Sequence, residues 1–378
     1  MSAQILDKVR EYKPPMSYLR RVIVELPELI YKRWMKLKAE DGYPDQGFDV
    51  WITAKTRDVY LGVHEGESIQ EATKGLLEMW VQNFANNLPF IREKGKSIRD
   101  LVSKEIEENP EKAQGAGIVV GRGPQMFANK QLEMLAASKF NGKIIATDGA
   151  LIDCLKRKIV PDYVLTVDGS PIIDKWYNDP LVNEYGSQIK AILSGTVHPN
   201  VVSRIEKAGI EPHFFIPIFD DFRSAQGFTQ IESMATKCAR YPEGLVLVAA
   251  GGNAGTTCWI LGSNVLRLSP LALIGIEFGY RPEDEIESTY YWPKVLMGFE
   301  AIDKTLEAYT KMYNPEFDCW VVQDPIMRHY HASFMELVTK TPPWIQTLVC
   351  SPGSLYEYRE PKSFSCKPFE QFLRENSL

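Results

Sequence analysis

Several features that mark common protein classes are missing from this 378-residue sequence. No apolar stretch is long enough to cross a bilayer, and the first residues lack the apolar core of a signal peptide. The six cysteines never form a CxxC pair, which argues against a disulfide framework or a zinc site. We therefore predict a cytoplasmic protein with reduced thiols and no membrane span.

Charge of one sign is not concentrated either. The net charge is −6, without a long basic run, so we expect no nucleic-acid partner. A GxSxG elbow and a Ser-His-Asp order are both absent, and so is the third glycine of the dinucleotide fingerprint. With 44% hydrophobic and 24% charged residues, the composition is that of a globular protein with one to three domains.

The ends of the chain differ from its middle. Residues 1–112 carry apolar residues at three- and four-residue spacing, with one hairpin-like stretch at 48–63, which predicts a mainly helical N-terminal module. Residues 283–378 begin with a helical pattern over 295–313. One strand over 318–322 and a tail rich in proline and aromatic residues follow. We interpret this part as a C-terminal α/β extension.

Between these ends, over residues 116–282, short apolar runs alternate with helical stretches. Strand and helix repeated in this way predict parallel strands joined by crossover helices. The fold class is therefore α/β, a Rossmann-like open, mostly parallel sheet with helices on both faces. Ligands of such sheets bind outside the carboxyl ends of the strands, so the residues that follow each apolar run carry the functional information.

The first apolar run ends in GIVVGRGPQMF, with Gly121 and Gly123. Two interpretations stay open at this point. The glycines either turn the chain tightly, or they let backbone amides approach a phosphate that larger residues would keep away. We predict that Gly123 serves this approach, so that Gly123→Val abolishes nucleotide binding at little cost in stability.

The richest loop, AAGGNAGTT, contains three glycines, an asparagine and two threonines before a helix. Free amides at the start of that helix favour an anion site, whereas helix capping alone is the simpler alternative. The predicted ligand-binding residues of this loop are Gly251, Gly252, Asn253, Thr256 and Thr257.

Three acidic residues follow other apolar runs. Asp148 and Asp168 come after neighbouring runs and Glu277 after the last one. Carboxylates at neighbouring strand ends suit a magnesium ion or sugar hydroxyls. For Asp148, helix capping is the alternative.

Four motifs occur together in one order: VVGRGPQ, IIATDGALIDCLKRKIVPDYVLTVDGSP, AAGGNAGTTCWILG and LALIGIEFGY. In this combination residues 116–282 resemble the MptE-like family. That family includes archaeal 6-hydroxymethyl-7,8-dihydropterin diphosphokinases and bacterial motility accessory factors. The latter resemble glycosyltransferases that modify flagellin with nonulosonic acids.

The resemblance places Gly121 and Gly123 in the family's Gly-x-Gly-Pro loop, where Gln125 replaces a common serine. Glu277 replaces a common aspartate. The diphosphokinase branch resembles Thr-Asp-x-Asp-Gly at a site where this chain has the single acid Asp168. The missing carboxylate weakens a two-acid magnesium site and favours the glycosyltransferase-like branch.

The resemblance implies a transferase. Gly121, Gly123 and the 251–257 loop would hold the phosphates of a nucleotide donor, a CMP-sugar or ATP, while Asp148 and Asn253 orient its base or ribose. Asp168 would bind Mg²⁺ or a sugar hydroxyl, and Glu277 would act as an acid or base.

Two alternatives stay open beside the glycosyltransferase. One is a pterin diphosphokinase with ATP and magnesium at the same loops, and the other is a non-catalytic nucleotide-binding or assembly protein. The acceptor is a small molecule or a protein, and a homo-oligomer stays open.

Overall fold

The computed structural model describes residues 69–109, 111–217, 245–248, 250–282, 310–323, 325–339, 341–356 and 363–377. The expected hairpin over 48–63 and most of the expected helix over 295–313 lie outside these residues.

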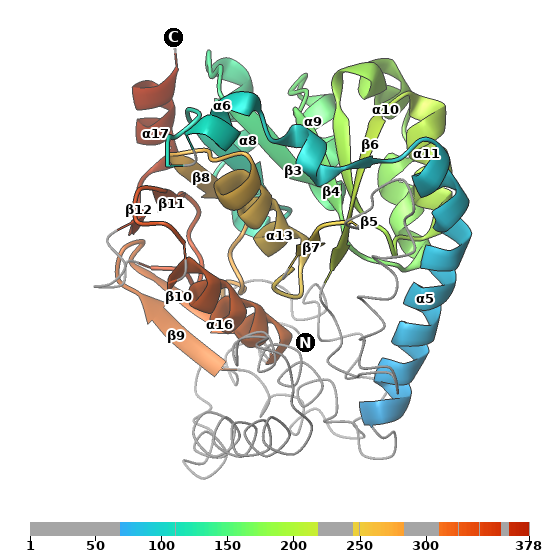
Figure 1. Ribbon diagram of the computed structural model, residues 1–378. Helices are drawn as coiled ribbons and strands as arrows, with labels where there is room; N and C mark the ends of the chain where they lie inside the picture. Colours follow the sequence, from blue (N-terminus) through green and yellow to red (C-terminus); the bar gives the residue numbers. More distant parts are fainter. Residues whose placement is uncertain are drawn as a thin grey trace.

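One sheet forms the centre of the molecule (Figure 1). Its strands lie in the order β1-β6-β5-β4-β3-β2-β8-β11-β12, and β7 pairs with β6. The bounds are β1 Lys96–Ser97, β2 Gly117–Val120, β3 Lys143–Thr147, β4 Tyr163–Thr166, β5 Lys190–Ser194, β6 Glu211–Pro217, β7 Leu247–Val248, β8 Leu271–Ile274, β11 Thr347–Val349 and β12 Phe364–Cys366.

All pairs in this sheet are parallel among the described strands, which confirms the predicted α/β class. Strand β2 illustrates why the sheet is parallel, because all four residues of Gly117–Val120 are buried. An apolar run without alternation suits a strand that helices cover on both faces.

The chain changes direction across the sheet at β2. From β2 the strands β3, β4, β5 and β6 follow one another toward one edge, whereas β8 pairs with β2 on its other side. The carboxyl ends of β2 and β8 therefore form a topological switch point. Loops diverge there to opposite faces and leave a crevice, the usual place for a ligand in this class of sheet.

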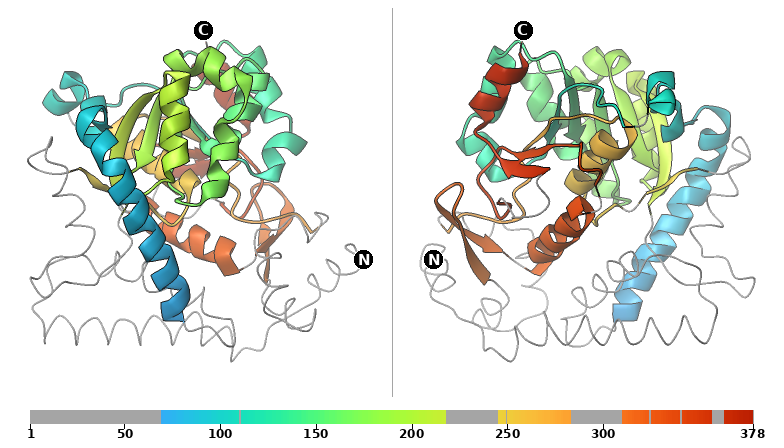
Figure 2. Two further views of the ribbon diagram at one scale, coloured as in Figure 1. Left: turned by 90° about the vertical axis from the view of Figure 1, so that its right-hand side faces the viewer. Right: turned by 60° about the vertical axis from the view of Figure 1, so that its left-hand side comes forward.

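Helices cover both faces of the sheet (Figure 2). Apolar residues of α13 and α16 pack on one face, and those of α5, α8, α9, α11 and α17 pack on the other. The α-helix bounds are α5 Ile69–Glu93, α6 Lys104–Glu108, α7 Pro124–Ala128, α8 Gln131–Ala137, α9 Asp148–Lys156, α10 Pro180–Tyr185, α11 Pro199–Ala208, α13 Ala254–Ile260, α16 Pro325–Thr339 and α17 Phe369–Asn376.

Shorter helical turns complete the described chain. Three are 3₁₀-helices, and the fourth is a π-helix that directly continues α13. Their bounds are η2 Ile98–Leu101, η3 Pro171–Tyr177, η4 Gly186–Gln188 and η5 Leu261–Val265.

The sheet extends beyond the 116–282 segment on both sides. Strand β1, from the segment expected to be a mainly helical N-terminal module, pairs with β6, and α5 buries Phe84 and Ile91 in the same core. Strands β11 and β12 come from the carboxyl-terminal tail and continue the sheet from β8. Both flanking segments thus contribute to the central core.

A second, two-stranded antiparallel sheet projects from the main body beside α16 (Figure 1). It consists of β9 (Thr310–Asn314) and β10 (Cys319–Gln323). Strand β10 confirms the expected strand over 318–322. The expected helix over 295–313 is wrong at its carboxyl end, because residues 310–313 belong to β9, whose pairing with β10 overrides the helical spacing.

Candidate functional site

A cavity of about 570 Å³ lies at the switch point. The loops that follow β2 and β8, the end of β3, the start of α13 and one side of α16 line it. The lining residues are Gly121, Arg122, Gly123, Pro124, Phe127, Thr147, Asn253, Gly255, Gly275, Ile276, Glu277, Phe278, Gly279, Tyr280, Met327 and Tyr330. The cavity therefore brings together both predicted glycine loops and the last strand end, within the size range of small-molecule sites.

Gly121 lies where the backbones after β2 and β8 meet. Its amide donates to the Ile274 carbonyl at 2.8 Å, and a Cβ atom on Gly121 would overlap the carbonyl oxygen of Gly275. Gly275 has a φ of +67°, and a Cβ atom there would lie 2.7 Å from the Gly121 oxygen. Close approach of two strand ends thus requires both glycines.

Gly123 packs against the side chain of Glu277. The carboxylate of Glu277 accepts hydrogen bonds from the amides of Gln125 at 3.1 Å and Met126 at 3.2 Å, and its residue is 3% exposed. Glu277 therefore occupies the start of α7, where a phosphate was expected to bind after the Gly-x-Gly loop. Both carboxylate oxygens of Glu277 thus accept hydrogen bonds from the start of α7, while the residue also lines the cavity.

This contact changes what Gly123→Val is expected to do. The φ of Gly123 is −68°, so the backbone is not strained, but a Cβ atom would lie 2.5 Å from the Glu277 carboxylate. A valine must displace Glu277 from the start of α7. We now expect the substitution to reduce stability as well as binding, so it does not separate the two interpretations of the loop.

The second glycine loop also carries an internal cap. Asn253 is the N-cap of α13; its Oδ1 accepts from the Thr256 amide at 2.8 Å, and its Nδ2 donates to Thr256 Oγ1 at 2.9 Å. The Thr257 hydroxyl donates to the Ala250 carbonyl at 2.9 Å. Gly251 and Gly252 have φ values of +59° and +79°, which explains glycine at both positions. These contacts account for the capping alternative, and within this loop Asn253 and Gly255 line the cavity.

Thr147, at the end of β3, differs from both loops. It is the N-cap of α9, but its side chain makes no capping hydrogen bond. The residue is 5% exposed and lines the cavity, and its Oγ1 has no hydrogen-bond partner in the described part of the chain. A buried hydroxyl without a partner is unfavourable unless something else satisfies it. Sequence inspection missed this residue, because a single threonine before a helix is indistinguishable from an ordinary cap.

Asp148 and Asp168 follow neighbouring strand ends, and the charge of Asp168 acts on Asp148. Burial, with a smaller contribution from the negative charge of Asp168, raises the pKa of Asp148 to about 6. Burial, and then the charge of Asp148, also raise the pKa of Tyr177 well above its ordinary value. Asp168 itself is exposed and accepts a hydrogen bond from the Ser170 amide at 2.8 Å. The two predicted acids are therefore close in space, although neither side chain lines the cavity itself.

Helix α5 supports the loop that carries Asp168. Asn83 is 5% exposed, and its amide donates to the carbonyls of Gly169 at 2.9 Å and Thr196 at 3.1 Å. Asn87 donates in the same way to Val197 at 2.8 Å. These bonds fix the carboxyl-end loops of β4 and β5 from a helix outside the predicted 116–282 unit.

Arg122, between the two glycines, supplies the positive charge of the cavity wall. Its guanidinium carbon lies 4.8 Å from the Trp176 ring centroid and 5.9 Å from that of Phe127, and its Nε donates to Asp153 at 3.2 Å. Stacking between two rings and one ion pair hold the guanidinium in place. Phe127 lines the same cavity.

Metal ligands are sparse among the residues that the structure describes. They contain no group of three His, Cys, Asp or Glu side chains that could hold a metal ion, and none of their five cysteines forms a disulfide bond. None of the described helices combines the length and hydrophobicity that spanning a bilayer requires.

The fold and the cavity define a Rossmann-like α/β protein with a cavity at its switch point. A family model described as "6-hydroxymethylpterin diphosphokinase MptE-like" matches residues 82–283, which is more than half of the chain. This chain belongs to the MptE-like family. The match begins within α5, in agreement with the packing of that helix into the central core.

A comparison with solved structures places the fold. The chain is similar to the structure of the MAf glycosyltransferase from Magnetospirillum magneticum AMB-1, with a TM-score of 0.52 and 16% sequence identity. The similarity covers 85% of this chain and 42% of that one, so this chain spans less than half of the length of that protein. At this identity the likeness shows the fold alone. No curated protein matches the sequence.

Proposed function

We propose that this chain is a nucleotide-binding transferase that uses a nucleotide-activated sugar as its donor. The observation that carries the proposal is the cavity at the switch point, together with Thr147, a lining residue whose buried hydroxyl has no partner among the described residues. In open parallel sheets this is the position where nucleotides bind. The family membership and the fold shared with a MAf glycosyltransferase support the same class of reaction.

The cavity offers each part of a nucleotide sugar a suitable neighbour. The Thr147 hydroxyl donates to a phosphate oxygen, and the Arg122 guanidinium offsets phosphate charge from the adjacent strand end. Phe127, Tyr280 and Tyr330 offer ring surfaces for the base or the sugar. Gly121, Gly123 and Gly255 also line the cavity, and because their Cβ positions face other protein atoms, they shape its wall through close packing.

Sugar transfer requires the site to stabilise a leaving phosphate and to accept one proton. The bond from the anomeric carbon to the donor phosphate oxygen breaks, its electron pair stays with the nucleotide, and an acceptor oxygen forms the new bond. Thr147 and Arg122 stabilise the charge that develops on the leaving phosphate. Asp168, exposed beside Asp148, is our candidate for the group that takes the acceptor proton or holds Mg²⁺.

Magnesium is compatible with these two acids. Mg²⁺ is usually held by one or two carboxylates together with substrate phosphates and water, and Asp148 and Asp168 are close enough to influence each other. An ion held there would offset phosphate charge. The same pair favours a second candidate function, the diphosphokinase in the family's description, in which the pyrophosphate group of ATP moves to a hydroxyl and AMP leaves.

A nucleotide panel followed by product analysis tests the proposal. CMP, CDP, UDP, GDP and ATP are added to the full chain with and without Mg²⁺, and the matching nucleosides serve as controls without phosphate. A ligand at one hundred times its Kd adds about 2.7 kcal/mol of stability, an easily measured rise in melting temperature. We expect one pyrimidine or guanine nucleotide to bind, and its nucleoside to bind far more weakly.

The two enzyme candidates give different products. Release of the free nucleotide from its sugar conjugate supports the glycosyltransferase, and AMP formation from ATP that depends on a hydroxymethylpterin supports the diphosphokinase instead. If no nucleotide raises the melting temperature, the chain is a non-catalytic member of the family and the proposal is wrong.

A further inference from the structure

Helix α16 forms one side of the cavity at the switch point. Met327 and Tyr330, three residues apart on this helix, both line the cavity. Residues at this spacing lie on one face of a helix, and Phe334, four residues further along, continues that face. The family model ends at residue 283, so this wall of the cavity comes from a segment that the family match does not include.

Phe334 anchors this face of α16 to the central core. It is fully buried, and its ring centroid lies 4.9 Å from that of Trp259 in α13 and 5.5 Å from that of Phe278. Phe278 follows β8 and also lines the cavity. The anchor therefore holds Met327 and Tyr330 at the β8 side of the cavity.

A buried glutamine of β10 holds the same wall from a second direction. Gln323 is 5% exposed; its Nε2 donates to the Phe278 carbonyl at 2.7 Å and lies 3.3 Å from Nδ1 of His331 in α16. The backbone of Tyr280 pairs with Val322 of β10 through hydrogen bonds of 2.8 and 2.7 Å. The chain after β8, the hairpin and α16 thus support one another, and the wall is a fixed part of the structure.

This side of the cavity is apolar and aromatic. Its lining residues are Phe278, Tyr280, Met327 and Tyr330. A flat heteroaromatic base gains from ring stacking and from contact with a thioether, and both contacts are possible for every base. Arg122 and Thr147 line the cavity from other elements, after β2 and at the end of β3. The charged and the apolar lining residues therefore come from different strand ends.

The strand order places the candidate groups in a row. Strands β4, β3, β2 and β8 are neighbours in this order and run parallel, so their carboxyl ends lie at one edge. Asp168 follows β4 and Thr147 ends β3, whereas α16 packs against Phe278, which follows β8. Thr147 therefore lies between Asp168 and the α16 wall.

We propose that the base of the donor nucleotide binds against α16, with Tyr330 stacking on it and Met327 beside it. In a nucleotide sugar the phosphate separates the nucleoside from the sugar. With the phosphate at Thr147, these two parts extend to opposite sides of that residue. The sugar faces Asp168, our candidate for the group that takes the acceptor proton, and the base reaches the α16 wall.

The inference rests on the proposed function, which supplies the position of the phosphate and the reacting side. It adds that affinity for the base is determined by Tyr330 and Met327, outside the segment that the family model matches. Members of the family that share residues 82–283 but differ in α16 are then expected to differ in how tightly they bind the base.

Titration calorimetry on the full chain without Mg²⁺ tests the position of the base. The probes are CMP, CDP, UDP, GDP and ATP, together with ribose 5-phosphate, which keeps the ribose and a phosphate but lacks the base. We expect the tightest nucleotide to bind at least tenfold more tightly than ribose 5-phosphate, because the sugar phosphate cannot stack on an aromatic side chain.

Variants of the wall separate base binding from phosphate binding. Tyr330→Leu keeps an apolar side chain but removes the ring, so it should weaken the nucleotide about tenfold and leave the affinity for ribose 5-phosphate unchanged. Tyr330→Phe keeps the ring and should bind the nucleotide within about threefold of the unmodified chain. Thr147→Val should instead weaken both probes, because both contain phosphate.

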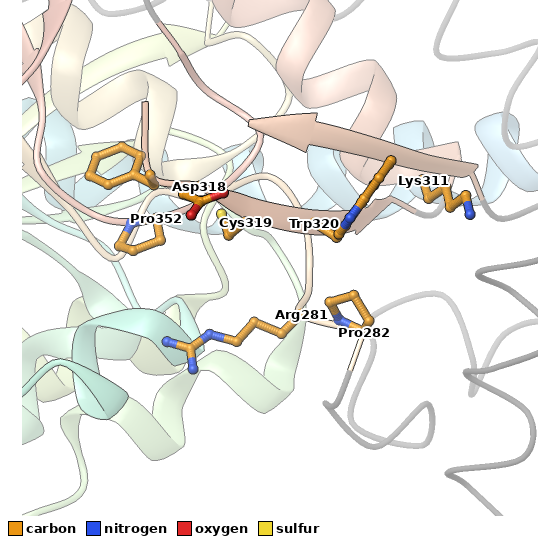
Figure 3. Close-up of a pocket in the computed structure, with 8 residues that line it drawn as sticks. Arg281, Pro282, Lys311, Asp318, Cys319, Trp320 and Pro352 are labelled. Carbon is orange, nitrogen blue, oxygen red and sulfur yellow. The ribbon is translucent and has the colours of Figure 1, made fainter. Parts of the chain in front are cut away.

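Trp320→Ala is the matched control. Trp320 is 49% exposed and, together with Lys311 and Pro282, lines a second cavity of about 600 Å³ beside the β9–β10 hairpin (Figure 3). The two cavities share no lining residue. Removing this aromatic ring should therefore leave the affinity for the nucleotide unchanged.

Three results overturn the inference. They are unchanged nucleotide affinity in Tyr330→Leu, equal weakening of the nucleotide and ribose 5-phosphate in that variant, and equal binding of both probes to the unmodified chain. If urea denaturation shows that Tyr330→Leu is unfolded, the same comparisons are made with Met327→Ala, which should weaken the nucleotide several-fold.

The failure of the inference is distinguishable from that of the proposed function. Each of the three results leaves the proposed function standing, because the unmodified chain still binds a nucleotide. Absence of nucleotide binding by the unmodified chain removes the proposed function and the inference together.

Discussion

The two glycine loops of the site look alike in sequence, but different side chains occupy the helix starts that follow them. After Gly123 the start of α7 is taken by the carboxylate of Glu277, which comes from the end of β8. After Gly252 the start of α13 is capped locally by Asn253. In both loops a side chain therefore accepts hydrogen bonds from helix-start amides that the sequence predicted to bind phosphate. The glycines shape the cavity by letting backbones approach each other, rather than by leaving helix starts open.

The end of β3 differs from both loops. It carries no glycine before its helix, yet its N-cap side chain, Thr147, is buried in the cavity wall and lacks a partner. From this comparison we infer that Thr147, at this strand end, is the residue that binds the ligand. Backbone approach and ligand recognition would then belong to different strands.

The largest effect is expected where two backbones meet. Gly121→Ala adds a Cβ atom that overlaps the Gly275 carbonyl, so strands β2 and β8 must separate at their carboxyl ends. We expect a loss of about 4 kcal/mol in the free energy of unfolding, above the ordinary range for overpacking because the obstacle is backbone. Urea denaturation measures it.

Gly115→Ala is the matched control for Gly121→Ala. Gly115 has a φ of +102° with no atom within 4 Å of the added Cβ, so it should lose only about 1 kcal/mol from backbone strain. Equal losses at the two positions would mean that close approach is not the reason for Gly121.

Asp148→Asn tests the buried acid at the β3 end through the pH dependence of stability. The folded pKa of about 6 exceeds the ordinary aspartate pKa of 3.8, so between about pH 4 and pH 6 the folded state keeps a proton that the unfolded state has released. The stability of the unmodified chain therefore falls as pH rises through this window. Asparagine does not ionise and still accepts from the Gly149 amide.

We expect Asp148→Asn to match the unmodified chain below about pH 4 and to exceed it by about 3 kcal/mol above about pH 6. Chemical denaturation at several pH values measures the difference. A difference that is the same at all pH values would contradict the buried ionisation.

Removing the two internal caps compares the glycine loops directly. Glu277→Ala leaves the amides of Gln125 and Met126 without their acceptor and should cost about 2 kcal/mol. Asn253→Ala removes a neutral local cap and should cost about 1 kcal/mol. Glu277→Gln, which keeps one acceptor oxygen, should fall between Glu277→Ala and the unmodified chain. Thermal unfolding of the three variants gives the order, and a smaller loss for Glu277→Ala than for Asn253→Ala would reverse the account.

The central part of the fold was predictable because buried parallel strands have a strong signature. Runs such as Gly117–Val120 and Leu271–Ile274 are apolar throughout, and the structure confirms them as neighbouring strands. Their order in the chain also predicted that their carboxyl ends lie at one edge. The glycine loops and Glu277 meet there because of this topology.

The flanking strands were not predictable in the same way. Strand β1 has two residues and interrupts a charged, helical pattern, while β11 and β12 have three residues each within a tail rich in proline. Such short strands exist only because a long sheet offers them an edge, which is a tertiary effect. The aromatic residue Tyr330 reaches the cavity from this tail, so it was missed as well.

At the site, the sequence indicated the kind of residue but not its partner. Asn253 and Glu277 were chosen for chemistry that suits ligands, and the structure engages both in capping. Thr147 is the opposite case: the sequence did not indicate it, and only its burial and its missing hydrogen-bond partner distinguish it in the structure. The hydrogen-bond partners of Glu277 lie 152 and 151 residues away in the chain, and one sequence does not reveal them.

The affinity of Thr147 variants for the nucleotide found in the panel tests the central claim most directly. Thr147→Val removes the unpartnered hydroxyl and keeps the shape, so stability should stay or rise by about 1 kcal/mol, while nucleotide affinity falls about tenfold or more. Thr147→Ser keeps the hydroxyl and should bind within a few-fold of the unmodified chain. Raised stability with unchanged affinity in Thr147→Val would contradict the account, because the hydroxyl would then be only an unsatisfied buried group.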